Sequence, residues 1–397
     1  MKVLDSLVTH AASISAVRRD IHAHPELSFE ELRTSDLVAQ KLTEWGIPIH
    51  RGLGKTGVVG ILKNGSSPRA IGLRADMDAL PMQEFNQFAH TSQYAGKMHA
   101  CGHDGHVAML LAAAQHLAQH KNFDGTVYFI FQPAEEGGGG ALEMIKDGLF
   151  KLFPMDAVFG MHNWPGLGVG QFAVSAGPVM ASSNEFKITI HGKGSHAALP
   201  HNGVDPVPVA CQMVQAFQTI ISRNKKPVDA GVISVTMIHT GEATNVVPDH
   251  CEMQGTVRTF SLEVLDLIEQ RMRDVAQHTC AAFGATCTFE FERNYPPTIN
   301  HAPQSEVARQ VMASIVGEAN VLVQEPTMGA EDFSYMLQAL PGAYCFIGNG
   351  DGVHREIGHG EGPCTLHNPN YDFNDELIPL GGTYWVQLVE KLIGVRT

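Results

Sequence analysis

The chain has 397 residues, of which 44% are hydrophobic and 17% are charged, and this composition excludes a disordered or fibrous protein. Its length exceeds the size at which a single hydrophobic core stops growing, about 250–300 residues, so we expect two domains. The net charge of −14, without any block rich in Lys and Arg, argues against a nucleic-acid partner.

The first part of the chain predicts helices and short strands. Residues 14–45 show helical spacing of apolar residues, interrupted at His24-Pro25 because the residue before a proline is displaced from the α region. Short apolar runs predict strands at 58–62 and 70–75, and the second runs directly into Asp76-Met77-Asp78. Two carboxylates are therefore expected at the end of a buried strand.

Residues 98–106, with the sequence MHACGHDGH, combine a thiol, three imidazoles and a carboxylate. Gly102 and Gly105 allow the backbone to turn tightly around whatever these side chains bind. Cys101 and His103 are two residues apart, so both can face the same ion in a tight loop. The alternative is a solvated, histidine-rich turn that leads into the helix predicted at about 105–120.

Two further apolar runs, 126–131 and 157–161, predict buried strands, and polar side chains follow each of them. Glu135 and Glu136 follow the first strand, and His162 follows the second. Because ligands bind at the carboxyl ends of strands in open α/β sheets, we expect these side chains to converge. Taken singly, a histidine at a strand end is more often a hydrogen-bonded residue than a metal ligand.

The adjacent pair Glu135-Glu136 is the strongest indication of a metal. Two neighbouring carboxylates at the end of a buried strand repel each other unless a cation is present. One of them can bind the metal while the other takes a proton from the attacking water and delivers it to the leaving nitrogen. The alternative is an acidic cap for the helix predicted at 140–147, where negative charge is also favourable.

The pattern changes between residues 183 and 295, where three runs alternate apolar and polar residues as strands with one solvated face do. The expected strands are 186–191, 234–238, 252–258 and a closing strand at 287–291, with helices at about 205–223 and 261–283. This order is that of a ferredoxin-like α+β unit. We therefore predict an inserted domain at 183–295 that divides an α/β domain formed by residues 1–182 and 296–397.

The last part of the chain returns to the α/β pattern, with a helix at 304–316, a strand at 343–347 and a final helix from about 375. A long loop delivers His367 just before that helix. His367 could complete a ligand set, or it could be an ordinary loop histidine. A thiolate, imidazoles and carboxylates together suit zinc, manganese or cobalt better than calcium or magnesium.

The chain begins without the apolar core of a signal peptide, and no apolar run approaches the roughly 20 residues of a membrane span. We therefore expect a cytoplasmic protein with no membrane partner. The seven cysteines are scattered without paired spacing, which argues against a disulfide framework.

Six segments of the chain resemble the amidohydrolase branch of the aminoacylase/carboxypeptidase metallopeptidases, which includes hippurate hydrolases, N-acyl-amino-acid deacylases and plant auxin-conjugate hydrolases. The segments are 18–29, 74–81, 98–106, 132–136, 160–162 and 328–333, and they follow the same order over nearly the whole chain. The resemblance implies a metallopeptidase-like catalytic domain with two divalent metal ions, of which manganese, zinc and cobalt are the candidates. The ligands that it implies are Cys101, His103, Glu136, His162 and His367.

The resemblance also implies catalytic roles. Glu135 corresponds to the general base, and Asp78 corresponds to the aspartate that orients a ligand. The wider family has the motif His-x-Asp-x-x-Pro, and Asp76 stands here at the position of its histidine. The role of Asp76 is therefore open.

The inserted domain resembles the lid and dimerisation domain of the family, which implies a homodimer or a larger homo-oligomer. His196, in the motif at 192–198, would stabilise the oxyanion of the tetrahedral intermediate in its own site or in that of a partner subunit. Asn245 and Arg258 resemble substrate-binding residues and suit a free carboxylate, although Asn245 could equally be a turn residue before Pro248. A lid must close, so we expect hinges near 180–184 and 294–298.

The predicted function is metal-dependent hydrolysis of the amide bond of N-acyl amino acids, either hippurate-like or N-acetylated, to a carboxylic acid and a free amino acid. A dipeptidase or carboxypeptidase that uses the same two-metal site is the nearest alternative. A catalytically silent protein that binds a metal or a partner is a further alternative from another class.

Overall fold

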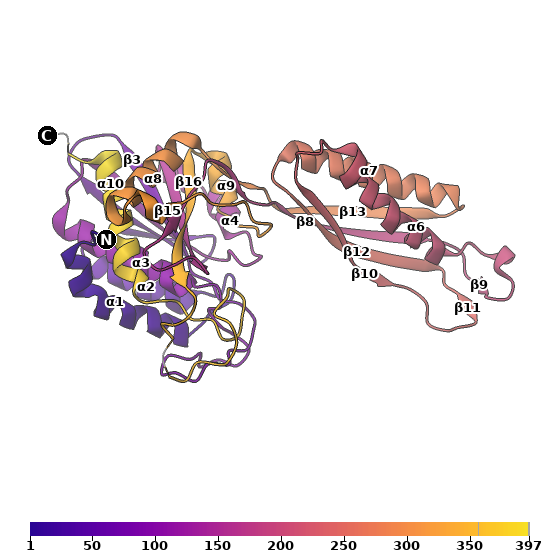
Figure 1. Cartoon of the computed structure of the whole chain (residues 1–397), viewed down its shortest axis with the longest axis horizontal. Helices are drawn as coiled ribbons and strands as arrows, with labels where there is room; N and C mark the ends of the chain where they lie inside the picture. The colour runs from indigo at the N-terminus through magenta and orange to yellow at the C-terminus, as the bar shows by residue number, and fades with distance from the viewer. Residues whose placement is uncertain (356, 396–397) are drawn as a thin grey trace. The chain divides into compact units, whose positions relative to one another are not determined.

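The computed structural model describes residues 1–355 and 357–395, which form two compact units (Figure 1). The first unit consists of Met1–Gly177, Ile299–Glu325 and the chain from Asp332 onward, and the second consists of Pro178–Thr298 and Pro326–Glu331. The second unit thus includes a short segment, 326–331, that lies outside the predicted insertion at 183–295. The sequence gives no sign that this segment belongs to the second unit, because it joins the unit through spatial contacts alone.

The first unit is built on an eight-stranded sheet with the order β1-β2-β4-β3-β5-β16-β6-β15. The strands are β1 (Ile49–Leu53), β2 (Gly57–Asn64), β3 (Ala70–Asp76), β4 (Gly125–Gln132), β5 (Ala157–Pro165), β6 (Phe172–Ala173), β15 (Val321–Leu322) and β16 (Gly342–Gly350). The central strands β4, β3, β5 and β16 run parallel, and every residue of β3 is buried. Parallel strands covered on both faces consist of nearly continuous apolar runs, which is why the sequence identified them.

Helices flank this sheet, and α3 is the most deeply buried of them. The helices of the unit are α1 (Asp5–Ala23), α2 (Leu32–Glu44), α3 (His103–His120), α4 (Gly140–Lys146), α5 (Leu149–Leu152), α8 (Ala302–Val316), α9 (Ser334–Ala339) and α10 (Leu377–Ile393), with a short 3₁₀ turn at Glu318–Asn320. Helix α3 packs against β3 and against α1, α2 and α10, whereas α4 and α9 contact each other and the strands β4 and β16. The predicted α/β class, with a central sheet flanked by helices, is confirmed. The first helix begins at Asp5, earlier than the apolar spacing suggested.

The second unit has its own antiparallel sheet with the order β10-β12-β8-β13. Its main elements are β8 (Ser183–His191), α6 (Pro206–Thr219), β10 (Gly231–His239), β12 (His250–Thr259), α7 (Leu262–Ala282) and β13 (Thr286–Tyr295). This chain order and sheet order are those of a ferredoxin-like unit. The smaller elements are a π-helical turn at Ile220–Asn224, a 3₁₀ turn at Pro200–Asn202, and the pair β9 (Ser195–His196) and β11 (Val246–Val247). The short strands β7 (Gly177–Met180) and β14 (Thr298–Asn300) contain the points at which the chain passes from one unit to the other.

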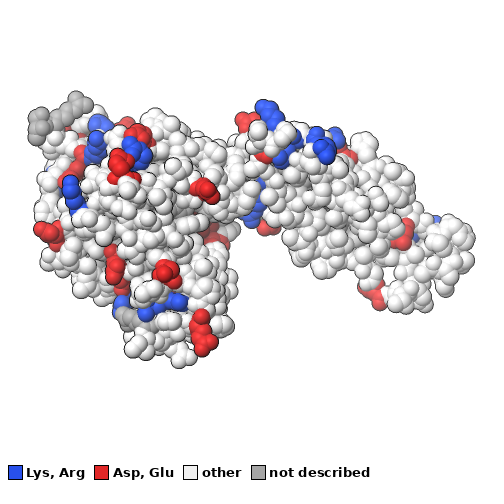
Figure 2. Space-filling view, in the orientation of Figure 1, with Lys and Arg blue, Asp and Glu red and all other residues white. Residues whose placement is uncertain are grey.

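The core of the second unit lies between its sheet and the helices α6 and α7. Alternate residues of β8, including Phe186, Ile188 and Ile190, are buried, as the alternating pattern predicted. Acidic and basic side chains are interspersed on the face of both units shown in Figure 2. On α7 they form ion pairs one turn apart, such as Arg273–Glu269 at 3.1 Å. Among the described residues, no helix is both long enough and apolar enough to cross a membrane.

Candidate metal centre

The candidate site lies in the first unit, where β3, β4 and β5 carry acidic residues and histidines to the same edge of the sheet. Asp76 is the last residue of β3, and Asp78 follows two residues later. Glu135 and Glu136 lie in the turn after β4. The prediction that His162 follows its strand is wrong, because β5 continues to Pro165 and His162 pairs with Phe346 of β16 within it. The neighbouring strand β16 extends the ladder beyond the apolar run.

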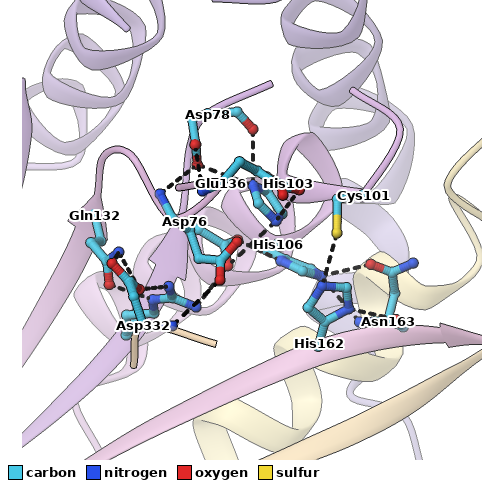
Figure 3. Close-up of polar contacts among 12 residues, drawn as sticks. Asp76, Asp78, Cys101, His103, His106, Gln132, Glu136, His162, Asn163 and Asp332 are labelled. Carbon is cyan, nitrogen blue, oxygen red and sulfur yellow. Dashed lines mark hydrogen bonds and ion pairs between the residues drawn. The ribbon is translucent and has the colours of Figure 1, made fainter. Parts of the chain in front are cut away.

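Cys101 and His103 lie at the beginning of α3, around a glycine that no other residue could replace without strain. Gly102 has φ of +92°, and a Cβ atom there would lie 2.4 Å from both the Asn163 amide oxygen and the Tyr371 hydroxyl. The chain therefore turns sharply between Cys101 and His103, the first residue of α3. This turn directs a thiol and an imidazole toward the same place, as Figure 3 shows.

The five predicted ligands come together in two overlapping groups. The ligand atoms of Cys101, His103 and His162 lie within 4.8 Å of one another, and so do those of Cys101, Glu136 and His367. The Sγ atom of Cys101 is 3.2 Å from Nε2 of His162. The other ring nitrogen of His162 donates to the backbone oxygen of Asn163 at 2.6 Å, which leaves Nε2 free of a proton and able to bind a cation. Cys101 belongs to both groups, so the thiol, the three imidazoles and the carboxylate of Glu136 would together hold the metal.

Asp78 orients both a candidate ligand and the segment that carries the glutamates. Nδ1 of His103 is 2.9 Å from the backbone oxygen of Asp78 and 3.3 Å from its Oδ1 atom, so Nε2 of His103 faces the candidate centre (Figure 3). The same carboxylate accepts the amide hydrogens of Glu135 and Glu136 at 3.0 and 2.9 Å. The hydrogen bond from His103 and its charge hold the pKa of Asp78 below its usual value, although burial acts in the opposite direction.

Two buried polar atoms at the centre have no hydrogen-bond partner, namely Nε2 of His103 and Oε1 of Glu136. Oε1 of Glu136 lies 3.3 Å from Nε2 of His367 and 3.9 Å from Nε2 of His103. Buried polar atoms without a partner are rare in folded proteins. These atoms, pointing toward one another together with a thiol, fit a bound metal cation.

The electrostatics of the site also fit a cation. Burial raises the pKa of Cys101 well above its usual range, and repulsion from Glu136 and Glu135 raises it further. Burial lowers the pKa of His103, but the negative charges of Asp76, Asp78 and Glu136 outweigh this effect and raise it to about 10. A divalent cation would reverse both tendencies, because it favours the thiolate and the neutral imidazole that bind it.

Asp76, whose role the sequence left open, has two strong partners in the structure. Oδ1 lies 2.6 Å from Nδ1 of His106, and Oδ2 accepts a hydrogen bond from Arg74 at 2.7 Å. Oδ2 is also 3.7 Å from Nε2 of His103, and Asp76, His103 and His106 form a third group of potential ligands. The hydrogen bonds to His106 and Arg74 already use both oxygens, so the geometry favours an orienting role for Asp76.

The substrate residues suggested by the sequence lie in the second unit, and the structure brings together only two of them. His196 and Asn245 line a cavity of about 900 Å³ with other residues of that unit, including His250 at the start of β12. Arg258 lies eight residues further along β12, which corresponds to about 25 Å at the rise of an extended strand. Arg258 therefore does not belong to the same cavity as Asn245.

Several supporting residues were not identified from the sequence. Arg74, Gln132 and Asp332 form a buried network below the centre, in which Gln132 donates to both carboxylate oxygens of Asp332 at 2.8 and 2.9 Å (Figure 3). Asp332 belongs to the motif at 328–333, and this motif is the only feature of the sequence that points to any residue of the network. Asn163 directly follows His162, and its amide oxygen is 2.7 Å from Nε2 of His106.

A family model described as peptidase family M20/M25/M40 matches residues 72–391. The chain is similar to a hippurate hydrolase of Campylobacter jejuni, at 38% identity over 99% of this chain and 100% of that protein. It is also similar to thermostable carboxypeptidase 2 of Saccharolobus solfataricus, at 43% identity over 84% of this chain and 85% of that protein. Among solved structures, it is similar to a dinuclear metal-binding peptidase of the M20 family from Bacillus subtilis, with a TM-score of 0.83, 33% identity and coverage of 96% of this chain and 98% of that chain.

Proposed function

The chain belongs to peptidase family M20/M25/M40 and is a hydrolase, and from this premise we propose that it cleaves the amide bond of N-acyl amino acids in a metal-dependent reaction. The products are a carboxylic acid and a free amino acid. The observation that carries the proposal is the convergence of the five candidate ligands, with two unpartnered buried atoms among them, beside the carboxylate of Glu135.

We propose that two divalent ions, of manganese, zinc or cobalt, are held by Cys101, His103, Glu136, His162 and His367. The similarity to a dinuclear metal-binding peptidase of the M20 family, together with five candidate ligands in two groups, supports two ions rather than one. Ions bound there would acidify the attacking water and polarise the amide carbonyl. Thiolate and imidazole ligands favour these borderline metals over calcium and magnesium.

Glu135 is the proposed general base. The residue is only 7% exposed, and one of its carboxylate oxygens lies within 4.8 Å of ligand atoms of His103 and Glu136. The carboxylate takes a proton from the attacking water and then delivers it to the leaving nitrogen. Asp78 supports this role because it binds the amides of Glu135 and Glu136 and the ring of His103.

His196, Asn245 and Arg258 are the proposed substrate-side residues, with His196 stabilising the oxyanion and the other two binding the free carboxylate. Arg258 lies about 25 Å along β12 from His250, which lines the same cavity as Asn245, and one amino acid is too short to bridge that length. A site that uses both residues therefore needs two copies of the chain. This separation supports a homodimer or a larger homo-oligomer.

Replacement of Glu135 by Gln tests the proposed mechanism. Glu135→Gln should keep the bound metal but lower kcat by at least about 100-fold, since a positioned general base contributes that much. Metal content is measured on the same sample. Glu143→Gln, which changes a half-exposed glutamate on α4, is the matched control and should leave kcat unchanged. Near wild-type activity of Glu135→Gln would contradict the mechanism.

A carboxypeptidase or dipeptidase is the second candidate, favoured by the similarity to thermostable carboxypeptidase 2. The two functions differ in whether the acyl side of the substrate carries an amino group. Metal-stripped protein, with and without added manganese or zinc, is assayed for amino acid released from hippurate, N-acetyl amino acids and dipeptides. Metal-dependent release from the N-acyl compounds alone supports the first function, and release from dipeptides alone supports the second.

A further inference from the structure

Glu31 is a fully buried glutamate of the first unit that has no part in the candidate metal centre described above. It immediately precedes α2, yet its side chain makes no capping hydrogen bond to that helix. Its carboxylate instead accepts hydrogen bonds from three other groups. Oε1 accepts the amide hydrogens of Phe29 at 3.0 Å and Ala134 at 2.9 Å, and Oε2 accepts the hydroxyl hydrogen of Thr56 at 2.6 Å.

The contact with Ala134 matters because this residue directly precedes Glu135 and has an unfavourable backbone conformation. Ala134 has φ of +54°, in the left-handed region that residues with a Cβ atom rarely adopt. Phe29, the other amide donor to Glu31, is also left-handed, with φ of +65°. Since Ala134 is completely buried, its amide has no access to solvent water as an alternative partner.

Glu31 and Asp78 together bind three consecutive amides of the segment that carries the glutamates. The amide of Ala134 donates to Glu31, and those of Glu135 and Glu136 donate to Asp78. The segment that carries the glutamates is also closely packed at Gly138. A Cβ atom on Gly138 would lie 2.7 Å from the Cβ atom of Ala134 and 2.9 Å from the ring of Phe29.

We propose that Glu31 is a positioning residue for the hydrolytic reaction, which fixes the left-handed backbone of Ala134 and thereby directs the side chains of Glu135 and Glu136. The inference rests on the proposed function, because it assumes that Glu135 is the base. Glu31 touches neither the substrate nor the metal ligands. Its effect on the reaction passes through one backbone amide, one residue before the base.

The test compares Glu31→Ala with Glu31→Gln in the manganese-loaded, full-length protein. Glu31→Ala leaves the amide of Ala134 without an acceptor, whereas the carbonyl oxygen of Gln can still accept both amide hydrogens and its NH₂ group can donate to the Thr56 hydroxyl. Glu30→Ala removes the neighbouring exposed glutamate and is the matched control. Burial raises the pKa of Glu31 to about 7. Assays at about pH 8.5 therefore keep the carboxylate largely ionised.

We expect Glu31→Ala to lower kcat by about 10- to 100-fold, the range for a lost hydrogen bond to a charged group, with KM within about twofold and the metal content unchanged. Glu31→Gln should restore kcat to within about threefold of wild type, and Glu30→Ala should have wild-type kcat. A purely structural role would lower the melting temperature of Glu31→Ala without changing kcat of the folded protein. That result would overturn the proposal.

If Glu31→Ala does not fold, Thr56→Val decides the question, because it removes only the hydroxyl that holds Oε2. Reduced kcat with unchanged metal content supports the positioning role, and unchanged kcat overturns it. Glu135→Gln separates this inference from the proposed function. Full activity of Glu135→Gln would refute the proposed role of Glu135 as the base, and with it the proposed function. Loss of activity in Glu135→Gln together with full activity of Glu31→Ala would refute only the role of Glu31.

Discussion

At the scale of single residues, Glu31 connects the chemistry of the site to the pH dependence of stability. Burial raises the pKa of Glu31 from 4.5 to about 7, repulsion from Asp78 adds to the rise, and the hydrogen bond from Thr56 opposes it. Because this pKa is higher in the folded than in the unfolded state, the folded state binds the proton more tightly. The contribution of Glu31 to stability is therefore full below pH 4.5 and declines as the pH rises to about 7.

Glu31→Gln has no such proton to lose. We expect the free energy of unfolding of Glu31→Gln, relative to wild type, to increase between about pH 5 and pH 8 by at most about 3 kcal/mol. Urea unfolding at several pH values measures this difference. Glu30→Gln, at the exposed neighbouring position, should show no change with pH relative to wild type. A constant difference between Glu31→Gln and wild type across the range would contradict the pKa shift.

The residues of the site differ in how far the sequence could identify them. Glu135 and Glu136 stand out because they follow an apolar strand, and the ligand set came from the resemblance of six segments to a known family. Glu31 could not be found in this way, because its partner Ala134 is 103 residues away in the chain. A hydrogen bond to a backbone amide leaves no pattern in the sequence, since any residue type supplies that amide.

At the scale of secondary-structure elements, the close packing of α10 on α3 holds the helix whose first turn carries His103. Gly381 of α10 faces Met109 of α3, and a Cβ atom at position 381 would lie 2.2 Å from the sulfur of Met109 and 3.1 Å from Met161. Gly382, the next residue, has more space, with its nearest side-chain atoms at 3.3 Å on Ala112 and Leu7. The two helices approach closely here because glycine has no side chain.

Gly381→Ala should therefore destabilise the protein by about 1–3 kcal/mol, the usual cost of overpacking, despite the higher helix propensity of alanine. Met109→Ala removes the clashing atoms, so the double variant should lose less stability than the sum of the two single variants. Gly382→Ala is the control on the same helix and should cost less stability than Gly381→Ala, because its nearest neighbours are about 1 Å further away. Chemical denaturation of the metal-loaded proteins measures all four variants, and additive effects of Gly381→Ala and Met109→Ala would exclude the contact as the cause.

The elements that sequence reasoning found are those whose pattern is local. The buried strands β3, β4 and β16 each contain an apolar run, and the strands of the second unit, such as β8, alternate. The strands β6 and β15 have two residues each and exist because β6 pairs with β16 on one side and with β15 on the other. No periodicity can be recognised over two residues, so such strands depend on tertiary contacts that the sequence does not reveal.

At the scale of the whole molecule, the two units have separate hydrophobic cores, and all five proposed metal ligands lie in the first unit. The three tryptophans of the chain, Trp45, Trp164 and Trp385, also belong to the first unit. Tryptophan fluorescence therefore reports on the unit that is proposed to bind metal. Circular dichroism reports on the helices and strands of both units.

Metal removal should consequently destabilise one unit and leave the other nearly unchanged. A ligand present at 100 times its Kd stabilises the folded state by about 2.7 kcal/mol, so stripping manganese with a chelator should lower the melting temperature followed by fluorescence by several degrees. Circular dichroism should show a second transition whose melting temperature does not change with manganese.

His367→Ala, which removes an exposed proposed ligand, should reduce the manganese-dependent shift in the melting temperature followed by fluorescence, whereas His359→Ala in the same loop region should preserve it. If manganese shifted the melting temperatures followed by fluorescence and by circular dichroism equally, the two units would unfold as one. The metal would then stabilise the entire chain rather than the first unit alone.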